Sequence, residues 1–328
     1  MTETVESATP EQLAWFADTF NSIVENVELV VRGKTRVVQL ALTALVSGGH
    51  LLLEDVPGTG KTSLARAIAQ SVGGVAGRIQ FTPDLLPGDV TGMSVYDQRS
   101  HEFHFHRGPV FANVLLADEI NRASPKTQSA LLEVMEEGRV TVDGETHAVP
   151  EPFFAVATQN PVEQAGTYRL PEAQLDRFLI KTSIGYPDPV STREILERAR
   201  VDVHRRVLPA VSTPEQVLAM TAIARCATTD PVLLDYVARL VDATRSAEEV
   251  RLGASVRGGI ALVRAAMTWA AAQGRSYVLP DDVKALAEPV LAHRLVLDPE
   301  AEFDGVTASS VVGRLLLDVV PPSERIAV

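Results

Sequence analysis

The stretch D-V-P-G-T-G-K-T at residues 55–62 decides how the rest of the chain is interpreted. The apolar run H-L-L-L-E at residues 50–54 predicts a short buried strand before it, and residues 63–72 predict a helix after it. Glycines in a turn between a strand and a helix allow successive backbone N–H groups to surround a phosphate. The N-terminus of the helix favours the same anion. This order of elements therefore predicts a P-loop that binds the phosphates of a nucleotide.

The residues of this loop have different expected roles. Lys61 reaches the β- and γ-phosphates of ATP, and the hydroxyl of Thr62 is a ligand for Mg²⁺. Asp55 departs from the general pattern G-x-x-x-x-G-K-[ST], which has glycine at that position. The intact G-K-T between a strand and a helix favours phosphate binding over a purely structural glycine turn. The residues that we expect to contact the nucleotide in this loop are Val56, Pro57, Gly58, Thr59, Gly60, Lys61, Thr62 and Ser63.

Two further strand ends carry polar side chains. Asp118 and Glu119 directly follow the apolar run V-L-L-A, and adjacent buried carboxylates are unfavourable unless a cation or another partner compensates them. After a P-loop strand, we expect Asp118 to hold Mg²⁺ and Glu119 to polarise the attacking water. Asn160 ends the next apolar segment, A-T-Q-N, and is expected to position the same water. Taken alone, each pattern also fits a solvated strand end or a turn; together they favour ATP hydrolysis over small-molecule kinase chemistry.

The order of elements along the chain predicts an α/β fold with a second domain. Strands and helices alternate up to about residue 183, which predicts a parallel sheet of about five strands whose ligands lie at the carboxyl ends. Two β-hairpins interrupt this pattern, one at residues 93–106 and one at 139–149, the latter turning at Asp143-Gly144. Residues 189–328 have helical periodicity throughout. We therefore expect a nucleotide-binding domain at residues 1–188, including two N-terminal helices, and an all-helical lid domain at residues 189–328.

Two arginines are candidates for contacts with the γ-phosphate. Arg177, in L-D-R-F, follows a short helix; it fits either an ion pair with Asp176 or Glu172, or an arginine finger that acts on ATP. Arg257, in G-A-S-V-R-G-G, begins a helix of the second domain and fits either a solvated arginine or a sensor of the γ-phosphate.

Composition excludes several other classes of protein. The 328 residues are 46% hydrophobic and 22% charged, which is enough apolar content for two packed domains. The 30 basic and 42 acidic residues give a formal net charge of -12, which argues against a protein that coats nucleic acid. A single cysteine excludes an internal disulfide. The acidic N-terminus without an apolar segment and the lack of an apolar run of about 20 residues predict a cytoplasmic protein without a membrane span.

The first hairpin contains three histidines, His101, His104 and His106. A metal site is conceivable because His104 and His106 share one face of a strand. No cysteine or carboxylate completes a ligand set at a suitable spacing, so we favour a solvated or pore-facing hairpin.

At this point the ordered motifs resemble those of the MoxR family of AAA+ ATPases, from about residue 30 to the end of the chain. The resemblance implies a homohexameric ring with ATP at the subunit interfaces, in which Arg177 comes from the neighbouring subunit and Arg257 is the sensor 2 arginine. It also implies that the two hairpins are the helix-2 insert and the pre-sensor-1 hairpin. The motifs, beside the P-loop, are F-T-P-D-L-L-P-G-D-V-T-G at residues 81–92, R-G-P-V-F at 107–111, L-L-A-D-E-I-N-R-A-S-P-K-T-Q-S-A-L-L-E-V-M-E-E at 115–137, A-T-Q-N-P at 157–161, L-P-E-A-Q-L-D-R-F at 170–178 and G-A-S-V-R at 253–257.

The resemblance further implies a chaperone that remodels, matures or activates a client protein. Clients with von Willebrand A-type domains, and the insertion of metals or cofactors, are the expected context. Three alternatives remain at this stage: a subunit of a metal-chelatase motor, a nucleic-acid-remodelling motor, and a nucleotide-gated binding scaffold that hydrolyses little ATP. The acidic composition makes nucleic acid the less favoured partner.

Overall fold

The computed structural model describes residues 7–56, 58–160, 167–199 and 207–322. The chain divides into two compact units, each assembled from more than one segment. The sheet unit comprises Ser22–Leu170 and Thr182–Leu218, and the helical unit comprises Met1–Asn21, Pro171–Lys181 and Ala219–Val328. These interleaved segments differ from the expected division between residues 188 and 189, which stays a prediction.

A five-stranded sheet confirms the predicted α/β fold class. Its strand order is β2-β5-β8-β1-β9, and the pairs β2–β5, β5–β8 and β8–β1 are parallel. The central strands β5, β8 and β1 are almost entirely buried because their residues are apolar on both faces. The strands are β1 Leu51–Glu54, β2 Ala76–Gln80, β5 Val114–Asp118, β8 Phe154–Gln159 and β9 Ile180–Thr182.

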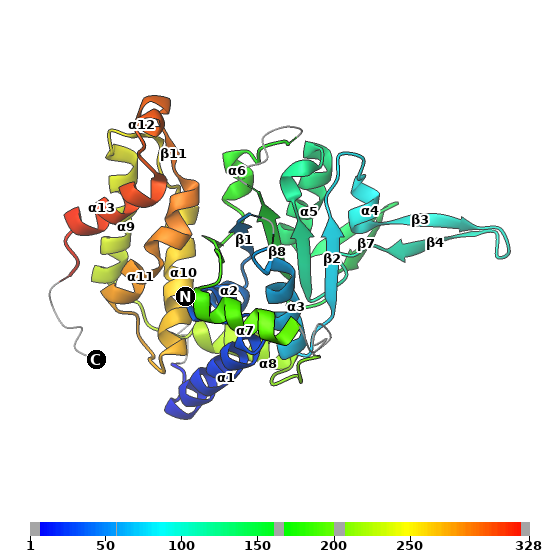
Figure 1. The fold of residues 1–328 in the computed structure, drawn as a ribbon, viewed down its shortest axis with the longest axis horizontal. Helices are drawn as coiled ribbons and strands as arrows, with labels where there is room; N and C mark the ends of the chain where they lie inside the picture. The colour runs from blue at the N-terminus through cyan, green and yellow to red at the C-terminus, as the bar shows by residue number, and fades with distance from the viewer. Residues whose placement is uncertain (1–6, 57, 161–166, 200–206, 323–328) are drawn as a thin grey trace, which may run out of the picture. The chain divides into compact units, whose positions relative to one another are not determined.

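Helices occupy most of the remaining chain, close to where the sequence predicts them (Figure 1). Helix α5 illustrates why these segments are helical: the Ser124 hydroxyl accepts a hydrogen bond from the backbone N–H of Thr127, Pro125 is the first residue, and Gly138 ends the helix with a φ of 65°. The helices are α1 Pro10–Glu28, α2 Thr35–Val46, α3 Lys61–Ser71, α4 Pro87–Thr91, α5 Pro125–Glu137, α6 Glu172–Leu175, α7 Pro189–Ala199, α8 Pro214–Ala224, α9 Pro231–Ser246, α10 Val256–Ala272, α11 Pro280–Leu291, α12 Pro299–Phe303 and α13 Ala308–Asp318, with 3₁₀ turns η1 Ile120–Arg122 and η2 Ala292–Arg294.

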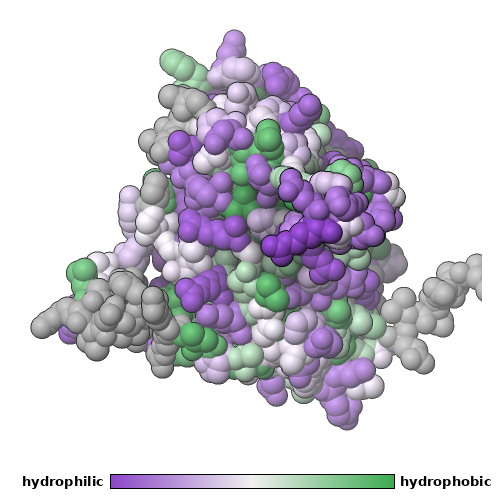
Figure 2. Space-filling view, turned by 90° about the vertical axis from the view of Figure 1, so that its right-hand side faces the viewer, coloured by the Kyte–Doolittle hydropathy of each residue, from purple (hydrophilic) through white to green (hydrophobic). Residues whose placement is uncertain are grey.

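Both predicted hairpins are present in the sheet unit. The first consists of β3 Gly92–Asp97 and β4 Glu102–Arg107, and it projects away from the sheet (Figure 1). Its side chains include the exposed aromatic residues Tyr96 and Phe103. Figure 2, viewed from the side on which this hairpin projects, shows hydrophobic residues interspersed with hydrophilic ones. The second hairpin consists of β6 Arg139–Val142 and β7 Glu145–Ala148, with the predicted turn at Asp143 and Gly144.

Two features add to the sequence-based prediction. The C-terminal region is not wholly helical, because β10 Val250–Leu252 and β11 Val296–Leu297 form a short antiparallel ribbon. The segment expected to be a loop after β2 contains helix α4, and Asp89 in this helix accepts a hydrogen bond from the N–H of Leu86, the residue before its start, at 2.9 Å. Among the residues described, no helix combines the length and the apolar character needed to cross a membrane.

Candidate nucleotide-binding site

The P-loop connects β1 to α3 in the arrangement that the sequence predicts. Gly58 and Gly60 have φ values of 87° and 97°, which residues with a side chain rarely adopt. A Cβ atom at either position would meet nothing within 4 Å, so glycine is needed here for its backbone angles and not for space. Gly60 directly precedes Lys61, the first residue of α3, whose opening N–H groups have no partner within the helix. The loop is therefore built to present N–H groups to an anion.

Two side chains of the loop donate hydrogen bonds to backbone oxygens of the same loop. Lys61 is buried, and its Nζ donates a hydrogen bond to the backbone oxygen of Asp55 at 2.9 Å. The Thr59 hydroxyl donates to the oxygen of Val56 at 3.3 Å. Thr62 and Ser63 are exposed at the start of α3. Pro57, which we also expect to contact the nucleotide, lies outside the described residues.

Asp55 has a structural role that accounts for its departure from the P-loop pattern. Its buried carboxylate accepts hydrogen bonds from the Ser183 hydroxyl at 2.9 Å, from the N–H of Ile184 at 2.5 Å and from the N–H of Gly185 at 3.0 Å. Hydrogen bonds to a charged acceptor are stronger than those between neutral groups. Asp55 therefore holds the segment after β9 against the first residue of the P-loop, which glycine cannot do.

Asp118 and Glu119 lie at the carboxyl end of β5, as predicted. Asp118 accepts a hydrogen bond from the Thr158 hydroxyl at 2.8 Å through Oδ1 and from the Arg78 guanidinium at 2.9 Å through Oδ2. Glu119 has a left-handed backbone conformation (φ 56°), and its N–H donates to the same Thr158 hydroxyl at 2.8 Å. Thr158 therefore connects both acidic residues to the neighbouring strand β8.

The carboxylate of Glu119 has its own hydrogen-bond donors. Gln80, the last residue of β2, donates from Nε2 at 3.0 Å, and Arg122 forms an ion pair with the same Oε2 atom at 3.0 Å. Both donors come from segments next to the end of β5, because β2 pairs with β5 in the register Gln80↔Asp118. The carboxylate of Glu119, which we expect to polarise water, is thus hydrogen-bonded to Gln80 and Arg122 in this structure.

Asn160 is buried and follows β8 directly. Strand β8 lies between β5, which ends in the acidic pair, and β1, which leads into the P-loop. The register Glu54↔Gln159 aligns the end of β8 with the end of β1. The sheet order thus brings the P-loop, the acidic pair and Asn160 to three adjacent strand ends, where ligands of such sheets bind.

The two candidate arginines belong to the helical unit. Arg177 is half-buried between α6 and β9, and the carboxylate of Asp176 beside it forms an ion pair with Arg294 at 2.7 Å. Arg257 is exposed as the second residue of α10, a helix capped by the Ser255 hydroxyl.

The histidine-bearing hairpin has local contacts that involve two of its histidines. His101 lies 3.0 Å from the hydroxyl of Tyr96, and His104 lies 3.0 Å from the hydroxyl of Ser100. Within the part of the chain that the structure describes, no three His, Cys, Asp or Glu side chains are grouped as a metal site would need.

Comparison with known proteins gives this arrangement a family. Residues 50–180 match the "ATPase family associated with various cellular activities (AAA)", and residues 242–315 match an "AAA lid domain". The chain is 44% identical to "Chaperone MoxR1" of Mycobacterium tuberculosis, over 95% of this chain and 85% of that protein. The chain belongs to the MoxR family of AAA+ ATPases. The resemblance inferred from the motifs is thereby confirmed, as is the ATPase activity.

Two other relatives match nearly the whole length of this chain. The uncharacterized protein YeaC of Bacillus subtilis is 48% identical over 93% of this chain and 95% of that protein. A crystal structure of a protein from Cytophaga hutchinsonii, assigned as an ATPase, superposes with a TM-score of 0.88 at 38% identity, covering 94% of this chain and 96% of that one. The fold described above is therefore shared with a solved structure over nearly the whole chain.

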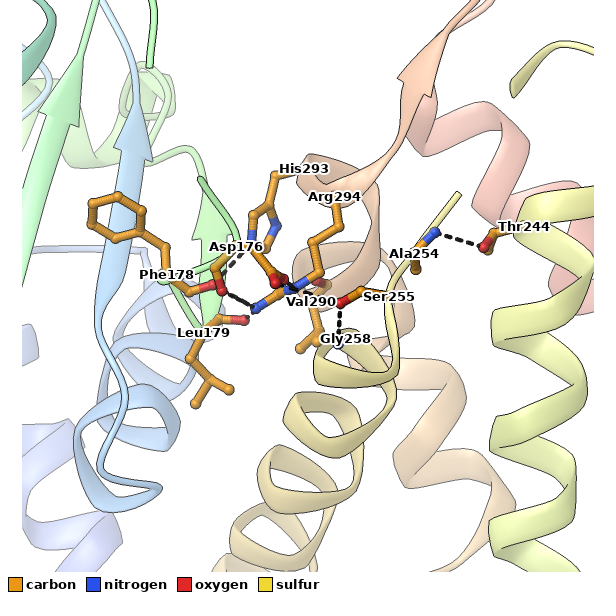
Figure 3. A network of polar contacts seen from close by, with 10 residues as sticks. All are labelled: Asp176, Phe178, Leu179, Thr244, Ala254, Ser255, Gly258, Val290, His293 and Arg294. Atoms are coloured by element: carbon orange, nitrogen blue, oxygen red, sulfur yellow. Dashed lines mark hydrogen bonds and ion pairs between the residues drawn. The ribbon is translucent and has the colours of Figure 1, made fainter. Parts of the chain in front are cut away.

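Several residues that bind the candidate side chains or their neighbours were not found from the sequence. Gln80 and Thr158 occupy strand ends, but only the sheet order shows that they face the acidic pair. Arg294 forms hydrogen bonds with residues 176–179 across more than a hundred positions of sequence (Figure 3). No local pattern distinguishes such an arginine from a solvated one.

Proposed function

We propose that this protein is the subunit of a homohexameric ring that uses ATP hydrolysis to remodel, mature or activate a partner protein. The observation that carries the proposal is the grouping of the P-loop, the acidic pair and Asn160 at three adjacent strand ends. This grouping supports hydrolysis, and membership of the MoxR family supports its use on a protein client, with von Willebrand A-type domain proteins as the first class to test. Cytoplasmic location stays a prediction.

The residues present fit a magnesium–nucleotide complex. The positive-φ glycines leave open space on the loop, and the donor set of a hydroxyl at Thr62 and a carboxylate at Asp118 consists of the oxygen ligands that Mg²⁺ prefers. Mg²⁺, when bound, would neutralise charge on the phosphates. Lys61 and the backbone N–H groups around Gly58, Thr59 and Gly60 would bind the phosphates of ATP.

The remaining roles concern the attacking water and the charge that develops on the phosphate. Glu119 would polarise the water, and Asn160 would fix its position by hydrogen bonding. Arg177 would stabilise the transferring phosphoryl group from a neighbouring subunit. Arg257 would contact the γ-phosphate from the lid.

Replacement of Glu119 with glutamine tests the hydrolytic role. Glu119→Gln keeps the size of the side chain and removes its basicity, so we expect ATP turnover to fall by about 10²–10⁴-fold with ATP binding retained. Glu133→Gln is the matched control, because Glu133 is exposed on α5 and the charge change is the same. Wild-type turnover in Glu119→Gln would remove this residue from the mechanism.

Two further experiments test the ring and the client. ATP turnover per subunit should rise with protein concentration as the ring assembles; a constant value would contradict a role for Arg177 in a neighbouring subunit. Glu119→Gln loaded with ATP should retain a client that the nucleotide-free protein releases. Duplex unwinding by the purified protein would instead favour a nucleic-acid motor, and metal insertion into a porphyrin would favour a chelatase.

A further inference from the structure

A single buried arginine holds the backbone on both sides of Arg177. Arg294 has a side chain that is 4% exposed, and it lies at the end of η2, directly after α11. Its Nε donates to the carboxylate of Asp176 at 2.7 Å, and its Nη2 donates to the backbone oxygens of Asp176 at 3.1 Å and Phe178 at 2.8 Å. A longer contact of 3.4 Å joins Nη1 to the oxygen of Leu179 (Figure 3). Arg294 therefore binds the residue before Arg177 and the two residues after it.

The N–H groups of the same segment are also fixed. The N–H of Arg177 donates to the oxygen of Gln174, and that of Phe178 donates to the oxygen of Leu175. With its N–H groups bound back to α6 and its carbonyls bound by Arg294, the backbone around Arg177 has little freedom. The direction in which the Arg177 side chain leaves the chain is thereby set.

Arg294 is itself held firmly in place. Its Nη1 also donates to the oxygen of Val290 in α11 and lies 2.8 Å from Nε2 of His293, whose Nε2 lies 2.9 Å from the backbone oxygen of Phe178. A Cβ atom on Gly258 would lie only 3.1 Å from Cδ of Arg294, so α10 packs closely against the arginine at this point.

The same contacts extend to the helix that carries Arg257. The hydroxyl of Ser255, the N-cap of α10, donates to the second carboxylate oxygen of Asp176 at 3.4 Å. The carboxylate of Asp176 thus links Arg294 on one oxygen to the start of α10 on the other (Figure 3). Within the helical unit, the segment of Arg177 and the first turn of α10 are parts of one hydrogen-bonded network.

The chemistry of Arg294 indicates that this arrangement is specific. Burial lowers the pKa of its guanidinium, and the charge of Asp176 opposes that effect. Burying a charged group is unfavourable unless it is paired and fully hydrogen-bonded. Only arginine offers five N–H donors in a fixed plane, and four acceptors of residues 176–179 receive them here. A lysine can supply the charge but not this pattern.

We propose that Arg294 is a positioning residue that aims Arg177 at the nucleotide of the neighbouring subunit. The inference rests on the proposed function, in which Arg177 acts across a subunit interface. Loss of Arg294 then impairs hydrolysis at the neighbouring site and leaves the P-loop of its own subunit intact.

Mixing of variants distinguishes this role from a structural one. Arg294→Met alone should lower turnover on the order of 10²-fold, as displacement of a catalytic group by about 1 Å does, with ATP affinity unchanged. Lys61→Ala alone should be inactive because it does not bind ATP, although it retains Arg177. In an equal mixture, about a quarter of the interfaces pair an intact P-loop with an intact Arg177, so turnover should recover to about that fraction of the wild-type rate.

Matched variants keep the test decisive. Arg275→Met removes another partly buried ion pair of the helical unit, with Asp282, and should lower stability without lowering turnover. Arg294→Lys keeps the charge, and Gly258→Ala places a methyl group about 3.1 Å from Cδ of Arg294 without removing a charge. Both variants should fold, and both should have lower ATP turnover. If these two folded variants keep wild-type turnover, or if mixtures of Arg294→Met with Lys61→Ala stay inactive, the proposal is wrong.

A parallel mixture separates failure of the proposed function from failure of this inference. Arg177→Ala mixed with Lys61→Ala should recover turnover in the same way, because both defects are complemented across the interface. If that mixture stays inactive, the interfacial role of Arg177 is wrong, and the role of Arg294 is overturned with it. If it recovers and the Arg294→Met mixture does not, only the role of Arg294 is overturned.

Discussion

Replacing Asp55 with alanine removes the acceptor of three hydrogen bonds at the first residue of the P-loop. The hydroxyl of Ser183 can turn to water, but the N–H groups of Ile184 and Gly185 would lose their partner in a buried or half-buried setting. A buried donor left without an acceptor costs about 1–3 kcal/mol, so the two N–H groups together predict a loss of about 2–6 kcal/mol. At about 2–4 °C per kcal/mol for a domain of this size, that loss corresponds to a fall in melting temperature of about 4–24 °C.

The measurement is thermal unfolding followed by circular dichroism, together with equilibrium titration of ATP. Lys61 donates to the backbone oxygen of Asp55, so a shift of this residue should also weaken ATP binding, by about tenfold. Asp235→Ala is the control: its carboxylate is 71% exposed, and loss of such a surface ion pair costs about 0–1 kcal/mol. A melting temperature of Asp55→Ala within 2 °C of the control would refute the reasoning, where ~2 °C corresponds to less than 1 kcal/mol.

Three other predictions each concern a single residue. Gly60→Ala forces a side chain into a φ of 97°, at a cost of about 1–3 kcal/mol, and should weaken ATP binding in a titration; unchanged affinity would contradict the need for glycine. Thr158→Val removes the hydroxyl that binds Asp118 and Glu119, so turnover should fall about 10–100-fold, and a wild-type rate would exclude that orienting role. Burial, followed by the charge of Arg294, holds the pKa of His293 well below 6.5, so the unfolded chain takes up a proton first as the pH falls. At pH values below ~6.5, the free energy of unfolding should therefore fall by about 1.4 kcal/mol per pH unit. His293→Gln should flatten this pH dependence, measured as the melting temperature at each pH.

Local chemistry explains which parts of the fold the sequence could predict. The turn at Asp143 and Gly144 needs positive φ values, which are 52° and 85°, and this dipeptide is a common solution. Ser124 before Pro125 marks the start of α5, because both residues satisfy requirements of the first helical turn alone. Where a few neighbouring residues decide the conformation, the sequence pattern is sufficient.

The remaining features depend on contacts that sequence patterns do not record. Arg294 and Asp176 are 118 positions apart, and charged residues are rarely buried, so neither appears as a partner of the other. Strands β10 and β11 are three and two residues long, too short for alternation to show. The role of Asp55 has the same origin: the sequence showed a departure from glycine, and only the pairing with residues 183–185 supplied its reason.

The contacts of Asp118 explain how one carboxylate can be held in place and still be available to a ligand. Its Oδ2 atom pairs with Arg78, whose side chain is 55% exposed, and an ion pair of that kind contributes only about 0–1 kcal/mol. Its Oδ1 atom accepts from Thr158, a fully buried residue that also binds the backbone of Glu119. A divalent cation would compete with Arg78 for the weakly held oxygen, while Thr158 continues to orient the group. Because the two oxygens are held so differently, binding of magnesium and nucleotide need not disturb the backbone that positions Glu119.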